Sequence, residues 1–342
     1  MSHHSFKNDY SFLAHRRVLE ALLRLQDEEN IAYGLDIHSD NAKKLIQNTF
    51  GAKDSEVYFL TGGTQTNMVF ISYVLKHYEG VIAVESGHIN VHESAAVEGN
   101  GYKIITVKGN NGKVTAKEIE EVTHHYNDEH MVVPKMVYLS NSTEIGSIYS
   151  LQELKDIYVV CQRTGLYLFI DGARLASAIT SSKNDIPASY YGSLCDAFYV
   201  GGTKNGLLSG EALVINHPSL RVNFRNHIKN KGAMLAKGFV LGIQFEEVFK
   251  DGLYFELAKH ANVMAEKVKE VLKEYPVTLY PSPTNQIFVS LNKKAALSLI
   301  EEFRLERWSE NDSEITVRFV TSFMTNENDV SELKKFLDKL FK

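Results

Sequence analysis

The chain has 342 residues, of which 44% are hydrophobic and 23% are charged, a composition that excludes extensive disorder and provides for a substantial core. Its 37 lysine and arginine residues are outnumbered by 42 aspartate and glutamate residues, so there is no basic excess for binding nucleic acid. Cys161 and Cys195 lie far apart and outside any CxxC spacing, which argues against a disulfide framework and a structural zinc site. No metal site is predicted.

The length fits a large domain followed by a smaller one, because domains usually contain roughly 100 to 200 residues. The first twenty residues carry charges throughout, and no stretch approaches the roughly 18 apolar residues of a membrane span. We therefore expect a cytoplasmic protein whose partners include neither nucleic acid nor membrane.

Apolar residues at helical spacing predict a helix over about 18–25, and a second helix is predicted near residues 39–50. Strand-like and helix-like segments then alternate. Helices are predicted over about 64–77 and 151–163, among short apolar strands at 57–60, 81–84, 102–107, 136–139, 167–170 and 197–200. This alternation predicts an α/β fold with a mostly parallel central sheet and helices on both faces.

A further strand at 212–215 precedes a long helical region that extends through about residue 273. Strands at 277–280, 287–290 and 315–320 then alternate with helices, which indicates a smaller C-terminal α+β domain. The expected organisation is an N-terminal arm, a large domain and a small domain, over residues 1–50, 51–245 and 246–342. Ligands of open α/β sheets bind beyond the carboxyl ends of the strands, so the functional residues should lie there.

Two strand ends carry a carboxylate and an amine. In the segment YLFIDGAR, Asp171 ends a buried strand, and the Gly-Ala turn after it lets a flat ligand approach. Alone, this aspartate could equally cap a helix, bind Mg²⁺ or bind a ribose. Lys204 follows another strand in the segment GGTKNG, where its amine can be desolvated enough to attack an aldehyde. A cofactor with a protonated pyridine nitrogen and an aldehyde needs both groups, so the pair is more specific than either residue.

The segment TGGTQT, with Gly62, Gly63 and Thr64 at its centre, lies between a predicted strand and a predicted helix. Glycines let backbone N–H groups approach an anion at a helix N-terminus, which predicts a phosphate site. The alternative is a tight turn with a threonine cap. The sequence contains no GxGxxG or GxxxxGK[ST] motif, so dinucleotide and P-loop sites are not supported.

Taken together, these elements resemble the fold type I pyridoxal-phosphate enzymes. The sequences of the motifs are similar to those of one family, the threonine aldolases. The similarity covers nearly the whole chain, and its most distinctive segments are DGARLA from Asp171, GGTKNG from Gly201, SNSTEIG from Ser140 and TVRFVTS from Thr316. The resemblance implies pyridoxal 5'-phosphate as the cofactor. Lys204 would carry the internal aldimine, Asp171 would bind the pyridine nitrogen, and the phosphate site at Gly62, Gly63 and Thr64 and the neighbouring Thr203 would complete the cofactor site.

The same resemblance implies roles at the substrate. Arg174 and Arg318 would clamp the substrate carboxylate, for which a bidentate guanidinium is well shaped. His88 would lie on the cofactor ring and exchange a proton. His130 would take the proton of the substrate hydroxyl, and Asn8 would contact the substrate, although many relatives have serine there. Gly238 stands where relatives often carry an arginine.

The implied activity is cleavage of L-threonine or L-allo-threonine to glycine and an aldehyde. The alternatives are another fold type I lyase, such as a β-eliminating lyase, and a catalytically silent protein that binds the cofactor. The resemblance also implies a homodimer or homotetramer with sites at the dimer interface.

Overall fold

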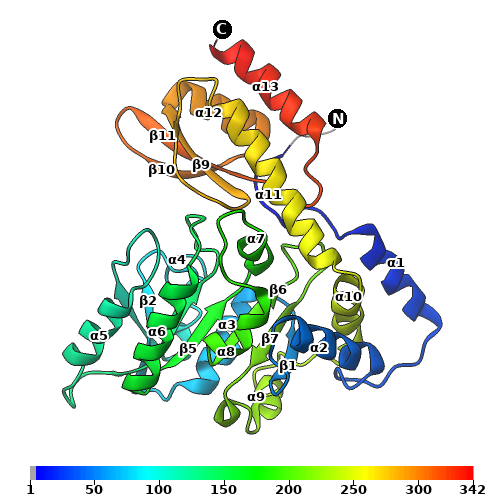
Figure 1. Cartoon of the computed structure of the whole chain (residues 1–342), viewed down its shortest axis with the longest axis vertical. Helices are drawn as coiled ribbons and strands as arrows, with labels where there is room; N and C mark the ends of the chain where they lie inside the picture. Colours follow the sequence, from blue (N-terminus) through cyan, green and yellow to red (C-terminus); the bar gives the residue numbers. More distant parts are fainter. Residues whose placement is uncertain (1–4, 342) are drawn as a thin grey trace.

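Seven strands form the main sheet in the computed structural model, which describes residues 5–341. Their order is β1-β7-β6-β5-β4-β2-β3. Only β7 runs in the direction opposite to that of the other six strands. The strands are β1 (Glu56–Leu60), β2 (Glu79–Val84), β3 (Lys103–Val107), β4 (Val133–Ser140), β5 (Tyr167–Asp171), β6 (Ala197–Gly201) and β7 (Glu211–Ile215). The mostly parallel sheet predicted from the sequence is confirmed (Figure 1).

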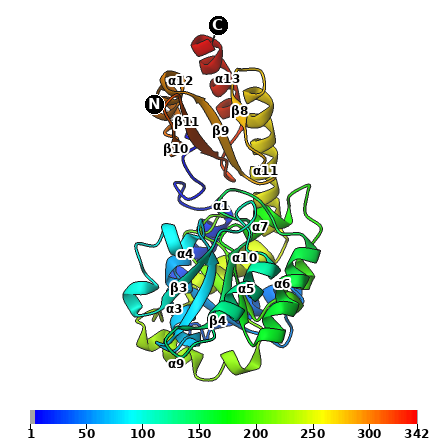
Figure 2. The same cartoon turned by 90° about the vertical axis from the view of Figure 1, so that its left-hand side faces the viewer.

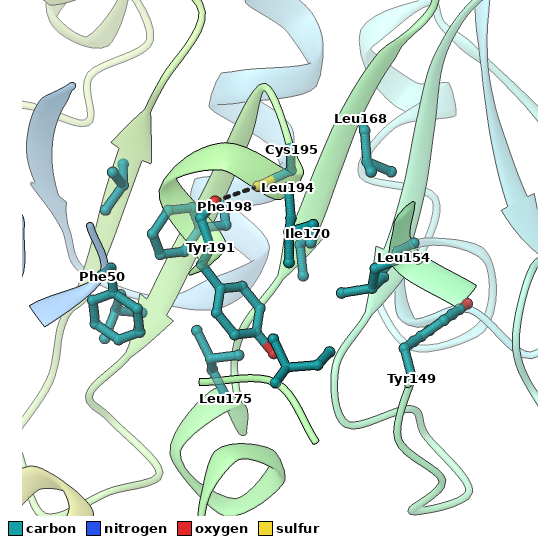
Figure 3. Packing of buried hydrophobic residues seen from close by; sticks show 14 of the residues in the cluster. Phe50, Tyr149, Leu154, Leu168, Ile170, Leu175, Tyr191, Leu194, Cys195 and Phe198 are labelled. Carbon is teal, nitrogen blue, oxygen red and sulfur yellow. Dashed lines mark hydrogen bonds between the residues drawn. The ribbon is translucent and has the colours of Figure 1, made fainter. Parts of the chain in front are cut away.

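Helices cover both faces of this sheet. One layer contains α2 (Ile37–Thr49), α5 (Ala116–His125), α6 (Leu151–Thr164) and α10 (Phe239–Phe249), and the other contains α3 (Gly63–Val74) and α9 (Phe224–Asn230). Alternate residues of a strand point to opposite faces, so in β5 Leu168 and Ile170 pack into the first layer and Phe169 into the second. Figure 3 shows part of the first layer around Ile170 and Phe198.

The sequence determines where α6 begins and ends. The Ser150 side chain accepts a hydrogen bond from the backbone N–H of Glu153, and the Glu153 carboxylate accepts one from the backbone N–H of Ser150. Gly165 ends the helix with a φ of 72°, which a residue without a Cβ adopts at little cost. The helix therefore delivers the chain into β5, the strand that ends in Asp171.

A second, four-stranded antiparallel sheet has the order β10-β11-β9-β8. Its strands are β8 (Thr278–Leu279), β9 (Gln286–Asn292), β10 (Glu306–Glu310) and β11 (Glu314–Val320), and its helices are α12 (Lys293–Phe303) and α13 (Glu327–Phe341). The 20-residue helix α11 (Leu253–Leu272), about 30 Å long, joins this part to the main sheet (Figures 1 and 2). The remaining helices are short: α1 (Arg16–Arg24), α4 (His88–Val91), α7 (Leu175–Ile179) and α8 (Tyr191–Leu194).

The N-terminal segment crosses between the two sheets. Phe6 is buried in the core of the small sheet, and its backbone bonds to the Phe303 carbonyl and the Val320 amide. The division into residues 1–50, 51–245 and 246–342 stays a proposal, and its second boundary falls within α10. Within residues 5–341, no helix is long and apolar enough to cross a membrane.

Candidate active site

A cavity of about 410 Å³ opens at the carboxyl ends of β4, β5 and β6, and the small sheet contributes residues to its wall. Most of the residues predicted from the sequence line it: Gly62, Gly63, Thr64, His88, Asp171, Arg174, Thr203, Lys204 and Arg318. Asn8 and His130 do not. The rule that ligands bind beyond the strand ends therefore located the cavity correctly.

Asp171 is a buried carboxylate held entirely by neutral donors. Its Oδ1 accepts hydrogen bonds from the Tyr199 hydroxyl (2.5 Å) and the Ala173 amide (3.0 Å), and its Oδ2 from the Tyr138 hydroxyl (2.5 Å) and Asn67 Nδ2 (3.1 Å). Burial acts to raise the pKa of Asp171, but the nearby His88 and these hydrogen bonds overcome that effect and lower it. The side chain is therefore ionised and offers a buried negative charge to a cationic ligand.

Lys204 follows β6 and lies close to Tyr10, with Nζ 6.0 Å from the centre of the tyrosine ring. Burial and the positive charge of Arg174 lower the pKa of Lys204, against the opposing charges of nearby carboxylates. A lowered pKa increases the neutral fraction of the amine, which is the form that attacks an aldehyde.

The anion site lies at the start of α3, a 12-residue helix. Its cap, Gly62, has an extended backbone and no side chain that could accept from the first helical amides. At Gly63 a Cβ atom would lie 3.0 Å from the Tyr199 hydroxyl, so the close packing of the helix start against Tyr199 favours glycine. Free amides at a helix N-terminus suit a phosphate.

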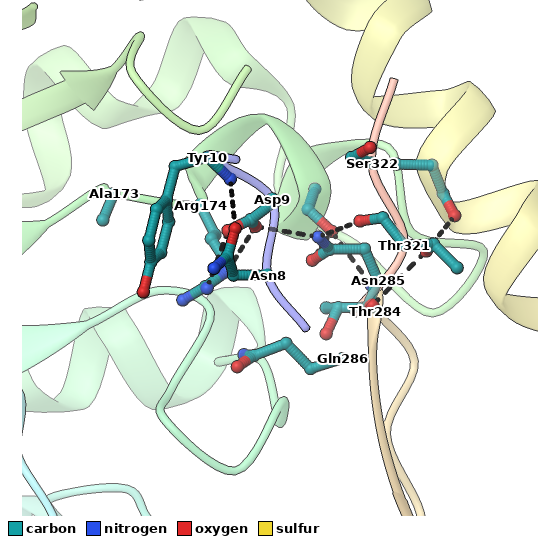
Figure 4. A network of polar contacts seen from close by, with 12 residues as sticks. Asn8, Asp9, Tyr10, Ala173, Arg174, Thr284, Asn285, Gln286, Thr321 and Ser322 are labelled. Atoms are coloured by element: carbon teal, nitrogen blue, oxygen red, sulfur yellow. Dashed lines mark hydrogen bonds and ion pairs between the residues drawn. The ribbon is translucent and has the colours of Figure 1, made fainter. Parts of the chain in front are cut away.

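Arg174 is oriented by a residue to which the sequence analysis gave no role. Its Nε and Nη2 donate to the two carboxylate oxygens of Asp9, at 2.7 and 3.0 Å, and Asn285 Nδ2 donates to the same carboxylate at 3.0 Å (Figure 4). Burial acts to raise the pKa of Asp9, but the charges of Arg174 and Lys204 lower it. This cluster joins the N-terminal segment, the main sheet and the small sheet beside the cavity.

Asn8, predicted to contact the substrate, instead shapes the chain next to this cluster. Its Oδ1 accepts hydrogen bonds from the Tyr10 amide (3.1 Å) and the Ser11 hydroxyl (2.8 Å). Asn8 does not line the cavity, so its contact with the substrate stays a prediction, and Tyr10 is the residue of this segment that lines the cavity.

We expect Asp9→Ala to lower the free energy of unfolding by about 3 to 5 kcal/mol, because it leaves the Arg174 guanidinium buried without its partner. Urea denaturation measures this loss. The matched control is Asp251→Ala, which removes a carboxylate from the partly exposed Arg17 and should change stability by no more than about 1 kcal/mol. Equal losses in the two variants would contradict the role given to Asp9.

Arg318, on β11, has one guanidinium nitrogen without a partner among the described residues. Its Nη1 donates to Gln286 Oε1 (3.0 Å), its Nη2 bonds to Glu306, and the guanidinium lies 5.2 Å from the centre of the Trp308 ring. Its Nε is buried and has no partner among the described residues. A buried donor without an acceptor is costly, and a carboxylate bound in the cavity could supply one.

His88 lies where the sequence predicted, after β2 and at the first position of α4, and its ring Nδ1 is 2.7 Å from Glu93 Oε1. His130 does not. It is exposed before β4, at the amino end of that strand, whereas the cavity lies at the carboxyl end beyond Ser140. Eight strand residues span about 25 Å, so this chain does not bring His130 to the cavity, and its action on the substrate hydroxyl stays a prediction.

Sequence reasoning missed several acidic and aromatic residues of the cavity. Glu144 lies in the segment SNSTEIG, for which no role at the site was predicted. Its Oε1 accepts from the Ser140 hydroxyl (2.6 Å) and the His88 amide (3.1 Å), and burial raises its pKa. Burial raises the pKa of Glu211 to about 7, although hydrogen bonds from Thr203 and the Gly202 amide oppose the shift. Glu144 follows the carboxyl end of β4, so the strand-end rule could have found it, whereas Glu211 begins the antiparallel strand β7 and reaches the same edge of the sheet by its amino end.

Gly238, where relatives often carry arginine, lies outside this cavity. A Cβ atom there would lie 2.6 Å from the backbone nitrogen of Gly34, so the local packing requires glycine.

Comparison with known proteins places these features in a family. Residues 15–294 match the family model described as beta-eliminating lyase. A low specificity L-threonine aldolase from a Pseudomonas species is 30% identical over 88% of this chain and 88% of its own length. The structure of Leishmania major threonine aldolase has a TM-score of 0.96 and 41% identity, covering 98% of this chain and 99% of that chain. Cystalysin from Treponema denticola, whose structure contains pyridoxal 5'-phosphate, shares the fold at a TM-score of 0.69 and 15% identity, over 98% of this chain and 91% of that chain.

Proposed function

Because this chain belongs to the beta-eliminating lyase family and, within it, to the threonine aldolases, we propose that it uses pyridoxal phosphate to cleave L-threonine or L-allo-threonine to glycine and acetaldehyde. The observation that carries the proposal is the convergence of Asp171, Lys204 and the N-terminus of α3 on one cavity. A β-eliminating or silent protein is the weaker candidate, since the relatives at 30% and 41% identity are both threonine aldolases.

The donors and charges of the cavity fit pyridoxal phosphate. The ionised Asp171 suits a protonated pyridine nitrogen, and the amine of Lys204 suits the aldehyde carbon. The amides after Gly62 suit the phosphate, and Thr203 fixes the loop before Lys204 by accepting from the Gly210 amide at 3.0 Å. When bound, the cofactor supplies an electron sink for the carbon whose bond is broken.

The remaining residues bind and orient the amino acid. The guanidinium groups of Arg318 and Arg174, which both line the cavity, would bind its carboxylate, and Asp9 holds Arg174 in place. A base must also take the β-hydroxyl proton. His130 does not reach the cavity in this chain, and the candidates on the cavity wall are His88, His92 and Glu144.

We also propose a homo-oligomer, dimer or tetramer, in the cytoplasm. Large apolar side chains of the N-terminal part are more than half exposed in one copy, which supports burial against a second copy: Leu13, Leu23, Ile31, Leu35 and Ile37. Light scattering of the purified protein tests the assembly, and cell fractionation tests the location.

The test of the activity is product analysis of the purified, cofactor-loaded protein with L-threonine, L-allo-threonine and phenylserine. We expect release of glycine and the matching aldehyde. Pyruvate and ammonia would instead identify a β-eliminating lyase, and no product from any amino acid would identify a silent protein.

A further inference from the structure

We infer that Glu93 is a positioning residue that fixes the His88 ring in the form with a hydrogen on Nδ1, so that Nε2 faces the cavity as the proton acceptor for the substrate β-hydroxyl. The inference rests on the proposed function, because it concerns a step of that reaction. It is carried by the contacts of two buried side chains, Glu93 and Asn67.

Glu93 lies five residues after His88 and is fully buried at its side chain, whereas the His88 side chain is 30% exposed and lines the cavity. The 2.7 Å contact joins Glu93 Oε1 to His88 Nδ1. The His88 backbone is held separately, by its N–H bond to Glu144. The ring is therefore anchored at one nitrogen by a group that the solvent does not reach.

Asn67 shows that Glu93 Oε1 is an acceptor. The Asn67 Nδ2 group donates one hydrogen bond to Glu93 Oε1 (2.7 Å) and another to Asp171 Oδ2 (3.1 Å). Only this orientation of the amide is favourable, because the reverse would place its oxygen between two carboxylates. With Oε1 accepting from Asn67, the hydrogen of the contact to His88 belongs on Nδ1.

The other ring nitrogen is then a free lone pair. Nε2 has no hydrogen-bond partner in the described part of the chain, and it is not among the buried polar atoms that lack one. His88 lines the cavity, and Nε2 is the ring nitrogen that is not tied to Glu93. A neutral imidazole with Nδ1 protonated accepts a proton only at Nε2.

The second carboxylate oxygen of Glu93 supports a role beyond packing. Glu93 Oε2 is buried and has no partner among the described residues. An unpaired buried carboxylate oxygen costs stability, and such groups gather where a charge is needed for function. Here the charge would stabilise the imidazolium that forms when His88 accepts a proton.

In the reaction step, the β-hydroxyl proton passes to His88 Nε2, and the electron pair of the O–H bond forms the C=O bond of the aldehyde. The pair of the broken Cα–Cβ bond stays with the glycine fragment. His88 later gives up the proton, and the electron pair on the glycine fragment takes it to form the new Cα–H bond. General-base assistance of this kind contributes about 10²- to 10⁴-fold.

The test combines a spectroscopic signature with a double-mutant cycle. The first measurement is NMR of the deuterated, cofactor-loaded protein with ¹⁵N-labelled histidine rings. The His88 signals are the ones that disappear in His88→Phe. In the wild-type protein they should report a hydrogen on Nδ1. Glu93→Gln should alter that signature and lower kcat for L-threonine by about 100-fold or more, with KM nearly unchanged. In the His88→Phe background the same change should have no further effect.

Two control variants separate this role from a general structural one. Glu98→Gln removes the same charge from an exposed residue nearby, and His124→Phe removes an exposed histidine, so both should keep wild-type kcat. An equal loss from Glu93→Gln with and without His88, or a wild-type ring without a hydrogen on Nδ1, would overturn the inference. The NMR signature of the wild-type ring needs no Glu93 variant. It therefore tests the inference even where Glu93→Gln does not fold.

A different result would overturn the proposed aldolase activity. A wild-type protein that releases no glycine would overturn that function, while a Glu93-dependent Nδ1 hydrogen would still support the assignment of the ring.

Discussion

Replacing Lys204 with alanine is expected to reduce glycine release from L-threonine by at least about 10⁵-fold, the scale on which enzymes lose activity when a covalent catalytic group is removed. Lys204 is the one lysine among the described residues that line the cavity. Its lowered pKa makes it the amine best suited to bond to the cofactor aldehyde. Initial-rate assays with saturating cofactor measure the loss.

Borohydride reduction followed by peptide mapping gives an independent readout. The cofactor should become fixed to the wild-type peptide that contains Lys204 and to no peptide of the Lys204→Ala variant. Lys237→Ala is the matched control, because Lys237 is exposed in the loop before α10 and should keep both turnover and labelling. Labelling of Lys237, or turnover in the alanine variant near the wild-type rate, would rule out the assignment of Lys204.

The sequence was sufficient for groups that short motifs bring to strand ends. Asp171 and Lys204 each end or follow an apolar strand, and parallel strands bring their carboxyl ends to one edge of the sheet. The pattern of apolar runs therefore predicted both the sheet and the location of the cavity. The same reasoning explains why His130 lies away from the cavity, since it precedes its strand and so lies at the opposite edge.

The sequence was insufficient where a side chain acts through a distant partner. Asp9 and Arg174 are 165 positions apart, and nothing in either local pattern indicates that they pair. The same holds for Asn67, which bridges Glu93 and Asp171 from another element. Such contacts depend on how helices and loops pack above the sheet, which periodicity does not specify.

One strand was missed for a local reason. β10, with the sequence ERWSE, is mostly polar and lies at the edge of the small sheet, so it has neither an apolar run nor a buried alternating face. It nevertheless carries Glu306, which bonds to Arg318, and Trp308, which packs against the same guanidinium. The sequence therefore predicted Arg318 for the carboxylate clamp without the residues that orient its side chain.

The second large effect is expected from Asp171→Asn, which should lower kcat for L-threonine by about 10²- to 10⁴-fold. The variant replaces a buried ionised carboxylate with a neutral amide, and losing one partner of a buried charge pair costs about 2 to 5 kcal/mol. The amide also cannot accept at both positions where Tyr138 and Tyr199 now donate, at 2.5 Å each. The cofactor should still bind, because the amine of Lys204 and the helix N-terminus at Gly62 are unchanged.

Turnover of this variant must be expressed per bound cofactor, measured by its absorbance, so that weak binding is not mistaken for slow chemistry. Asp196→Asn is the matched control: Asp196 is also a buried carboxylate, but it precedes β6 and accepts from the Leu168 amide at the opposite edge of the sheet. That variant should lose stability while keeping kcat per bound cofactor, because its carboxylate is remote from the cavity. A kcat for Asp171→Asn within about threefold of wild type would show that the buried charge of Asp171 does not support the reaction, since a tenfold change corresponds to only about 1.4 kcal/mol.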